Sequence, residues 1–261
     1  MSGPAQHKPV WEARVITLFP DAFPGTLGCS NVGRALASGL WSLKMFDLRN
    51  YGVGRHRCVD DSPAGGGPGM VMMPEVVSRA VSDCAVQDSG CPVRSTSNWP
   101  IICMSPRGRP FNQHLAERWS RIGGMTIICS RFEGIDERVF VRHDIEEISI
   151  GDFVLSGGEI AAQALIEATV RLIPTVLGNE DSATEESFAS GLLEYPQYTR
   201  PRDWNGFNVP EVLTSGHHGR IAEWRQAMSE ELTKSRRPDL WQAYKRTRIA
   251  SQERRSGKTI R

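Results

Sequence analysis

Residues 146–159 read Glu-Glu-Ile-Ser-Ile-Gly-Asp-Phe-Val-Leu-Ser-Gly-Gly-Glu, and this stretch contains a strand, a turn and the start of a helix. Its first part, residues 147–150, has the apolar character of a short strand. Ser156, Gly157 and Gly158 then give a turn signal, and Glu159 begins a helical pattern that ends before Pro174. A strand, a loop and a helix therefore follow one another, as they do in parallel α/β sheets.

The same alternation of strand and helix extends toward the N-terminus. Apolar segments predict strands at residues 11–18, 41–47, 100–104 and 125–129, and amphipathic segments predict helices at 32–38, 74–83 and 112–120. Residues 50–69 lack periodicity and predict a long loop, which includes Gly65-Gly66-Gly67-Pro68-Gly69. We therefore predict an α/β domain with a mostly parallel sheet.

Three of the predicted strands are followed by polar, glycine-containing loops, which begin at Ser105, Ser130 and Ile150. In an open α/β sheet, ligands bind beside the carboxyl ends of the strands, so we expect a small-molecule site there. The glycine-rich loop at residues 65–69 is not a P-loop, because no Gly-Lys-Ser/Thr follows it. That loop fits either close packing against nucleic acid or another chain, or a purely conformational role.

The C-terminal part of the chain has a different composition. Residues 178–190 are polar and acidic and predict a linker, whereas residues 210–213, 221–231 and 238–251 predict helices. From Tyr195 to Arg261 there are 14 Lys and Arg against 7 Asp and Glu, although the whole chain has a formal charge of only +1. Such a basic module is typical either of a surface that binds a polyanion or of a solvated helix face.

Length and composition exclude several classes of protein. The 261 residues are 39% hydrophobic and 23% charged, which fits one or two globular domains and not a disordered or fibrous chain. No apolar stretch approaches the ~20 residues of a spanning helix, and residues 1–9 lack the pattern of a signal peptide. We therefore expect a cytoplasmic protein with no membrane partner. The six cysteines form no Cys-x-x-Cys pair, so we expect reduced thiols and no metal site.

Five segments carry a resemblance to a known family. They read SPRGRPFNQ from Ser105, CSRFEGIDERV from Cys129, EEISIGDFVLSGGE from Glu146, RLIPTVLG from Arg171 and GLLEYPQYTRP from Gly191. Over about residues 15–240 the chain resembles the bacterial tRNA (guanine-N1)-methyltransferases of the TrmD type, in the SPOUT superfamily. The resemblance implies an α/β, SPOUT-type parallel sheet with a C-terminal trefoil knot in residues 1–177. A flexible linker (178–194), a small basic α-helical domain that binds tRNA (195–261) and a homodimer are also implied.

The resemblance further implies S-adenosyl-L-methionine as cofactor and methylation of N1 of the guanosine immediately 3′ to the tRNA anticodon, position 37. Guanine N1 carries a proton at neutral pH, so a base must remove it while a cation stabilises the charge that develops on O6. Glu186 is the predicted base and Arg171 the predicted cation. The cofactor-binding residues implied by the resemblance are Ser130, Glu133, Ile150, Gly151, Asp152, Phe153, Val154, Leu155, Gly157 and Gly158.

The chain departs from the family pattern at three places. Phe132 stands where the family commonly has Tyr, and Cys103 stands where a Tyr often precedes the Leu-Ser-Pro motif. The smaller Cys103 side chain predicts a looser cofactor pocket. Glu186 stands where the family has the Asp of Asp-Ser-Phe, so the carboxylate is kept on a longer side chain. Asp181, which is also followed by serine, is the alternative base.

Two other classes of function fit parts of the sequence. An RNA-binding or ribosome-binding protein with an inactive pocket would need only the basic C-terminal part, and an α/β oxidoreductase would bind its nucleotide at the same strand ends. The intact stretch at residues 146–159 argues against the first class. The absence of a Gly-x-Gly-x-x-Gly fingerprint in the sequence argues against the second.

Overall fold

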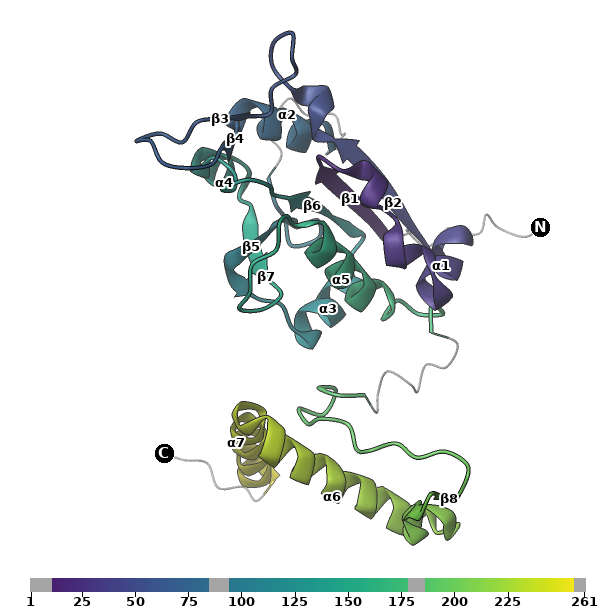
Figure 1. Ribbon diagram of the computed structural model, residues 1–261. Helices are drawn as coiled ribbons and strands as arrows, with labels where there is room; N and C mark the ends of the chain where they lie inside the picture. Colours follow the sequence, from purple (N-terminus) through teal and green to yellow (C-terminus); the bar gives the residue numbers. More distant parts are fainter. Residues whose placement is uncertain (1–10, 85–93, 178–185, 256–261) are drawn as a thin grey trace, which may run out of the picture. The chain divides into compact units, whose positions relative to one another are not determined.

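The computed structural model describes residues 11–84, 94–177 and 186–255 (Figure 1). The chain divides into two compact units, Met1–Gly178 and Asn179–Arg261. Several features discussed above lie outside the described residues: the segment 1–9, Cys91, the part of the predicted linker that contains Asp181, and the basic residues after Arg255.

The first unit is built on a parallel sheet of five strands (Figure 1). In spatial order these are β2 (Trp41–Asp47), β1 (Trp11–Thr17), β6 (Gly124–Cys129), β5 (Ile101–Pro110) and β7 (Glu146–Ser149). Every neighbouring pair runs parallel. The predicted α/β fold with a parallel sheet is therefore confirmed, and the carboxyl ends of β6, β5 and β7 lie side by side.

Helices cover both faces of the sheet and enclose two hydrophobic cores. One core packs beneath α1 (Ser30–Ala37), α3 (Gln113–Ser120) and α5 (Glu159–Val170), and the other beneath α2 (Pro74–Cys84) and α4 (Glu137–His143). Side chains alternate between the two cores along β1, since Ala13 and Val15 belong to the first and Ile16 to the second. Burial on both faces explains why the central strand β6 is buried at every position and almost entirely apolar.

The structure corrects the sequence interpretation in two parts of this unit. Helix α4 was not predicted; Asp136 caps it by accepting a hydrogen bond from the backbone N–H of Arg138 at 3.0 Å. The polar loop predicted to begin at Ser105 is instead part of β5. Met104 and Arg109 both pair with Ile148, so the residues between them bulge out of the strand. Short strands β3 (Asp60–Asp61) and β4 (Val71–Met72) flank the glycine-rich loop.

The second unit contains a β-hairpin and two helices. The hairpin pairs β8 (Asp203–Trp204) with β9 (Phe207–Asn208), and the helices are α6 (His218–Arg236) and α7 (Pro238–Arg255). The predicted helix at residues 210–213 is a single 3₁₀ turn, Glu211–Thr214, and Gly216 with φ 74° follows it. Before the hairpin, the backbone N–H of Leu193 donates to Thr233 Oγ1 on α6 at 2.8 Å, so this part of the predicted linker packs on the helix.

Within the described residues, no helix is long and apolar enough to span a membrane.

Candidate functional site

A cavity of about 360 Å³ lies at the carboxyl ends of β6 and β7, beside the irregular segment of β5 that follows Met104. The three loops that the sequence singled out as strand ends form its walls. All of the predicted cofactor residues except Asp152 line it: Ser130, Glu133, Ile150, Gly151, Phe153, Val154, Leu155, Gly157 and Gly158. The structure thus brings together nearly the whole predicted cofactor set in one concave site of a size suited to a small organic ligand.

The loop after β7 passes directly against the backbone of β6. The backbone N–H of Gly158 donates to the carbonyl oxygen of Ser130 at 3.1 Å. A Cβ atom at Gly158 would stand 2.8 Å from Cys129 Cα and 3.2 Å from Met104 Cβ. Only glycine fits at this crossing, because the neighbouring atoms belong to a buried strand and cannot move aside.

Replacing Gly158 with alanine is expected to weaken cofactor binding and to destabilise the first unit by about 1–3 kcal/mol, the usual penalty for overpacking a rigid core. Chemical denaturation and calorimetric titration with S-adenosylhomocysteine would measure both effects. The matched control is Gly219→Ala on α6, where a Cβ meets nothing within 4 Å and both quantities should stay unchanged. Wild-type behaviour of Gly158→Ala would show that the crossing is not tight.

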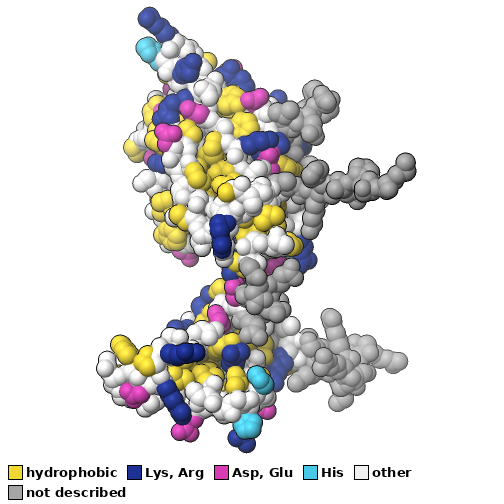
Figure 2. Space-filling view, turned by 90° about the vertical axis from the view of Figure 1, so that its right-hand side faces the viewer, with side chains coloured by type: hydrophobic (Ala, Val, Ile, Leu, Met, Phe, Trp, Pro, Cys, Tyr) yellow, Lys and Arg dark blue, Asp and Glu magenta, His cyan; other side chains and the backbone are white. Residues whose placement is uncertain are grey.

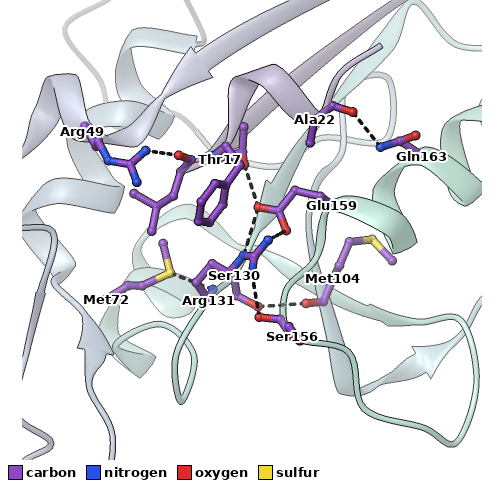
Figure 3. A network of polar contacts seen from close by, with 12 residues as sticks. Thr17, Ala22, Arg49, Met72, Met104, Ser130, Arg131, Ser156, Glu159 and Gln163 are labelled. Atoms are coloured by element: carbon purple, nitrogen blue, oxygen red, sulfur yellow. Dashed lines mark hydrogen bonds and ion pairs between the residues drawn. The ribbon is translucent and has the colours of Figure 1, made fainter. Parts of the chain in front are cut away.

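Arg131 occupies the space beside Gly157 and connects four parts of the site (Figure 3). Its Nη1 donates to the carbonyl oxygen of Ser156 at 3.1 Å, and its Nη2 lies 2.8 Å from Glu159 Oε2. Thr17 Oγ1 on β1 donates to the other oxygen of Glu159 at 2.8 Å. The guanidinium also lies over the Phe19 ring, 4.3 Å from its centroid. Neither Arg131 nor Glu159 is among the site residues that were predicted from the sequence.

The Arg131–Glu159 ion pair holds the loop after β7 in place, and the burial of Glu159 makes this pair important for stability. Glu159 begins α5 and is only 4% exposed, so its negative charge depends on partners that replace water. Those partners come from the end of β1 and from the loop after β6. A Cβ at Gly157 would overlap Nε, Cδ and Cζ of Arg131, so a side chain at position 157 displaces this arginine before it fills any ligand space.

The glycine-rich loop lies against Glu133 at the edge of the cavity. The backbone N–H of Glu133 donates to the carbonyl oxygen of Met70 at 2.9 Å, and the N–H of Met72 donates to Gly134 at 2.9 Å. A Cβ at Gly69 would overlap the Glu133 carboxylate. Gly69, at the end of this loop, therefore borders the space around this carboxylate.

The two buried cysteines beside the cavity are small apolar residues in practice. Burial raises the pKa of the Cys103 thiol to about 12 and raises the pKa of Cys129 well above its usual value. Both thiols are therefore protonated near neutral pH and inert as nucleophiles. The cysteines within the described residues are not joined in disulfides, and the part of the chain that the structure describes holds no His, Cys, Asp or Glu cluster suited to a metal ion.

The two predicted catalytic residues belong to different units. Arg171 follows α5 in the first unit, where its backbone N–H donates to Glu167, and it is not among the residues that line the cavity. Glu186 belongs to the second unit, where its carbonyl oxygen accepts from the N–H of Ala189 at 3.2 Å. Their roles stay predictions.

In the first unit, loops enclose a cavity at one end of a parallel α/β sheet. This is the arrangement of an α/β protein that binds a small organic ligand. Residues 12–243 match the family described as tRNA (Guanine-1)-methyltransferase TrmD, and the chain belongs to that family.

Individual relatives support the same assignment, and each is named tRNA (guanine-N(1)-)-methyltransferase. The protein from Ruegeria pomeroyi is 59% identical over 239 residues, which is 92% of this chain and 96% of the relative. The protein from Cereibacter sphaeroides strain KD131 is 60% identical over 237 residues, covering 91% and 94%. The protein from Bradyrhizobium diazoefficiens is 57% identical over 231 residues, covering 88% and 89%.

Proposed function

We propose that this protein transfers a methyl group from S-adenosyl-L-methionine to N1 of the guanosine at position 37 of tRNA, immediately 3′ to the anticodon. The observation that carries the proposal is the cavity lined by residues 150–158 in a chain of the tRNA (guanine-1)-methyltransferase family. A location in the cytoplasm fits this substrate.

The donor groups around the cavity fit S-adenosylmethionine. The peptide groups of residues 150–158 can pair with the adenine edge, while Leu155 and Phe132 offer apolar walls. The Glu133 carboxylate suits the positive charge of the ligand. When bound, the cofactor supplies an activated methyl group on its sulfonium. Asp152 lies outside the cavity lining, so we assign it no direct contact.

In the proposed reaction, Glu186 removes the N1 proton as N1 attacks the methyl carbon. Arg171 stabilises the negative charge that develops on guanine O6. The proton would pass to the Glu186 carboxylate, which would leave N1 free to accept the methyl group that the bound cofactor would supply. Holding the two reactants in line supplies the remaining rate enhancement.

We also propose that the first unit is knotted and that the protein is a homodimer. The knot is supported by the close approach of Gly158 to Cys129 and Ser130, because the loop after β7 passes against the end of β6 at this point. Support for the dimer comes from Phe153 and Val154, which are 52% and 82% exposed on the cofactor loop and would gain from burial against a partner subunit. Residues 178–194 are the proposed linker and residues 195–261 the proposed helical tRNA-binding domain.

The decisive experiment is methyl transfer from labelled S-adenosylmethionine to a tRNA transcript. Transcripts carrying guanosine at position 37 should be labelled, and transcripts with adenosine there should not. A thermal shift with S-adenosylhomocysteine but not with NAD separates this proposal from an oxidoreductase, because binding to the native state raises its stability. Label in the adenosine transcript, or none in either, would refute the proposal.

The basic segment Tyr195–Arg261 predicts a salt-dependent affinity for tRNA. Counterion release gives the logarithm of affinity a slope of about −0.9 per phosphate contact on duplex, and less on single strands. Replacing the exposed Lys234, Arg236 and Arg246 with glutamine should weaken binding and flatten that slope, measured by fluorescence anisotropy at several salt concentrations. Arg138→Gln, an exposed arginine of the first unit, is the control. An unchanged slope in the triple variant would place the RNA contact elsewhere.

A further inference from the structure

The β8–β9 hairpin carries two large aromatic rings on one face. Trp204 and Phe207 are directly opposite each other across a two-residue turn, with ring centroids 6.4 Å apart. Asn205 and Gly206, with φ of 53° and 85°, give the turn the twist that suits a tight hairpin. The backbone N–H of Val209 donates to the carbonyl oxygen of Arg202 at 2.8 Å and extends the ladder by one pair.

Neither ring contributes to a hydrophobic core. Trp204 is 64% exposed and Phe207 is 75% exposed, and every residue from Asp203 to Asn208 is exposed. Aromatic side chains gain much free energy when they are covered, so a pair of them in water points to a binding partner. The exposure also means that substitutions at these positions leave the folding of the unit intact.

An aromatic and cationic cavity adjoins the base of the hairpin. Its volume is about 410 Å³, and its walls include Arg202 and Val209, the pair that closes the hairpin ladder. Tyr198 and Trp224 also line it, with ring centroids 6.2 Å apart, and Arg200 contributes a second guanidinium. Hydrophobic and Lys or Arg side chains are intermingled on the face of this unit shown in the lower part of Figure 2.

We infer that the hairpin and this cavity form a contact site for unpaired nucleotides of the tRNA substrate, an inference that rests on the proposed function. The Trp204 and Phe207 rings stack on an exposed base, and Arg200 and Arg202 pair with the flanking phosphates. Aromatic stacking together with arginine–phosphate pairing is the combination that recognises single-stranded nucleic acid.

The chemistry of the surface favours RNA over a second copy of this chain. A purely apolar interface would need no guanidinium groups, whereas here Arg200 and Arg202 are exposed and line the cavity at the base of the hairpin. Duplex RNA hides the faces of its bases, so only a loop or an unpaired end offers a ring to the hairpin. The site therefore binds an unpaired segment of the tRNA and adds affinity for tRNA that the basic helices alone do not provide.

The test replaces both rings with leucine in the full-length protein, which keeps apolar surface but removes the aromatic faces. Trp204→Leu with Phe207→Leu should weaken binding to an unmodified tRNA transcript by about 10- to 100-fold. Trp204→Phe, which keeps a ring, should stay close to the parent. The far-UV circular dichroism of both variants should match that of the parent, which verifies that the helices of the second unit are folded, and their affinity for S-adenosylhomocysteine should be unchanged. A short single-stranded RNA should compete with tRNA for the parent protein better than a duplex of equal length.

The outcomes separate this inference from the proposed function. If the leucine variant binds tRNA as tightly as a parent protein that methylates the transcript, the inference alone is refuted. If the leucine variant instead sediments with a lower mass than the parent, the rings join two copies of the chain and the inference is again wrong. If the parent neither binds nor methylates tRNA, the proposed function fails and the inference fails with it.

Discussion

Glu186→Gln is expected to slow the methyl-transfer step by about 100- to 10,000-fold while the affinity for S-adenosylhomocysteine stays unchanged. Glutamine keeps the shape and hydrogen-bonding capacity of the side chain but cannot accept the N1 proton. Single-turnover rates at saturating tRNA measure the chemical step without contributions from binding or product release. Glu186→Asp should retain substantial activity, because it keeps a carboxylate and restores the residue implied by the family pattern.

Asp181→Asn is the matched control for this experiment. Asp181 lies five positions earlier and is followed by serine, as Glu186 is. If Asp181→Asn abolishes the reaction and Glu186→Gln does not, the base is Asp181. Equal and small effects of both variants would mean that neither carboxylate takes the proton.

Arg131→Met is expected to destabilise the first unit by about 3–5 kcal/mol and to remove most of its affinity for the cofactor. The stability loss follows because the Glu159 carboxyl group, only 4% exposed, loses its ion-pair partner and has no water to replace it. The loss of affinity follows because the carbonyl of Ser156, within the cofactor loop, loses its donor. Denaturant titration measures the first effect and calorimetry with S-adenosylhomocysteine the second.

Two further variants separate stability from loop positioning. Adding Glu159→Gln to Arg131→Met removes the unpaired buried charge, so the double variant should regain stability but not cofactor affinity. Arg138→Met breaks an ion pair with Asp136 at an exposed position and should change neither quantity. Parent-like cofactor affinity in Arg131→Met would show that the loop holds its shape without this arginine.

Local patterns in the sequence were sufficient to predict most of the first unit. The strand at residues 41–47 matches β2, because a run of apolar and β-favouring residues bounded by a glycine and a polar loop is a local signal. Helix α4 has only seven residues, too few for a helical period to stand out, and its Asp136 cap was the remaining signal. The Asn205-Gly206 pair was likewise a hairpin signal that sequence interpretation overlooked.

Contacts between distant segments could not be predicted from local patterns. The strand order places β1 beside β6, and the charge pair joins Arg131 in a loop to Glu159 on a helix. Nothing in the residues around either position specifies the other. The proposed cofactor residues rest on the resemblance of their motifs, whereas Arg131 and Glu159 follow only from the packing of three loops around one buried carboxylate.

The pairing of β1 with β6, the central strand of the parallel sheet, also affects when the first unit can fold during synthesis on the ribosome. Glu12 of β1 pairs with Gly124 of β6, so the centre of the sheet stays open until more than one hundred residues have followed β1. Nascent chains must therefore keep the apolar β1 and β2 segments from aggregating until β6 leaves the exit tunnel. Cofactor binding comes later still, because β7 and the loop after it are the last parts of the cavity to be translated.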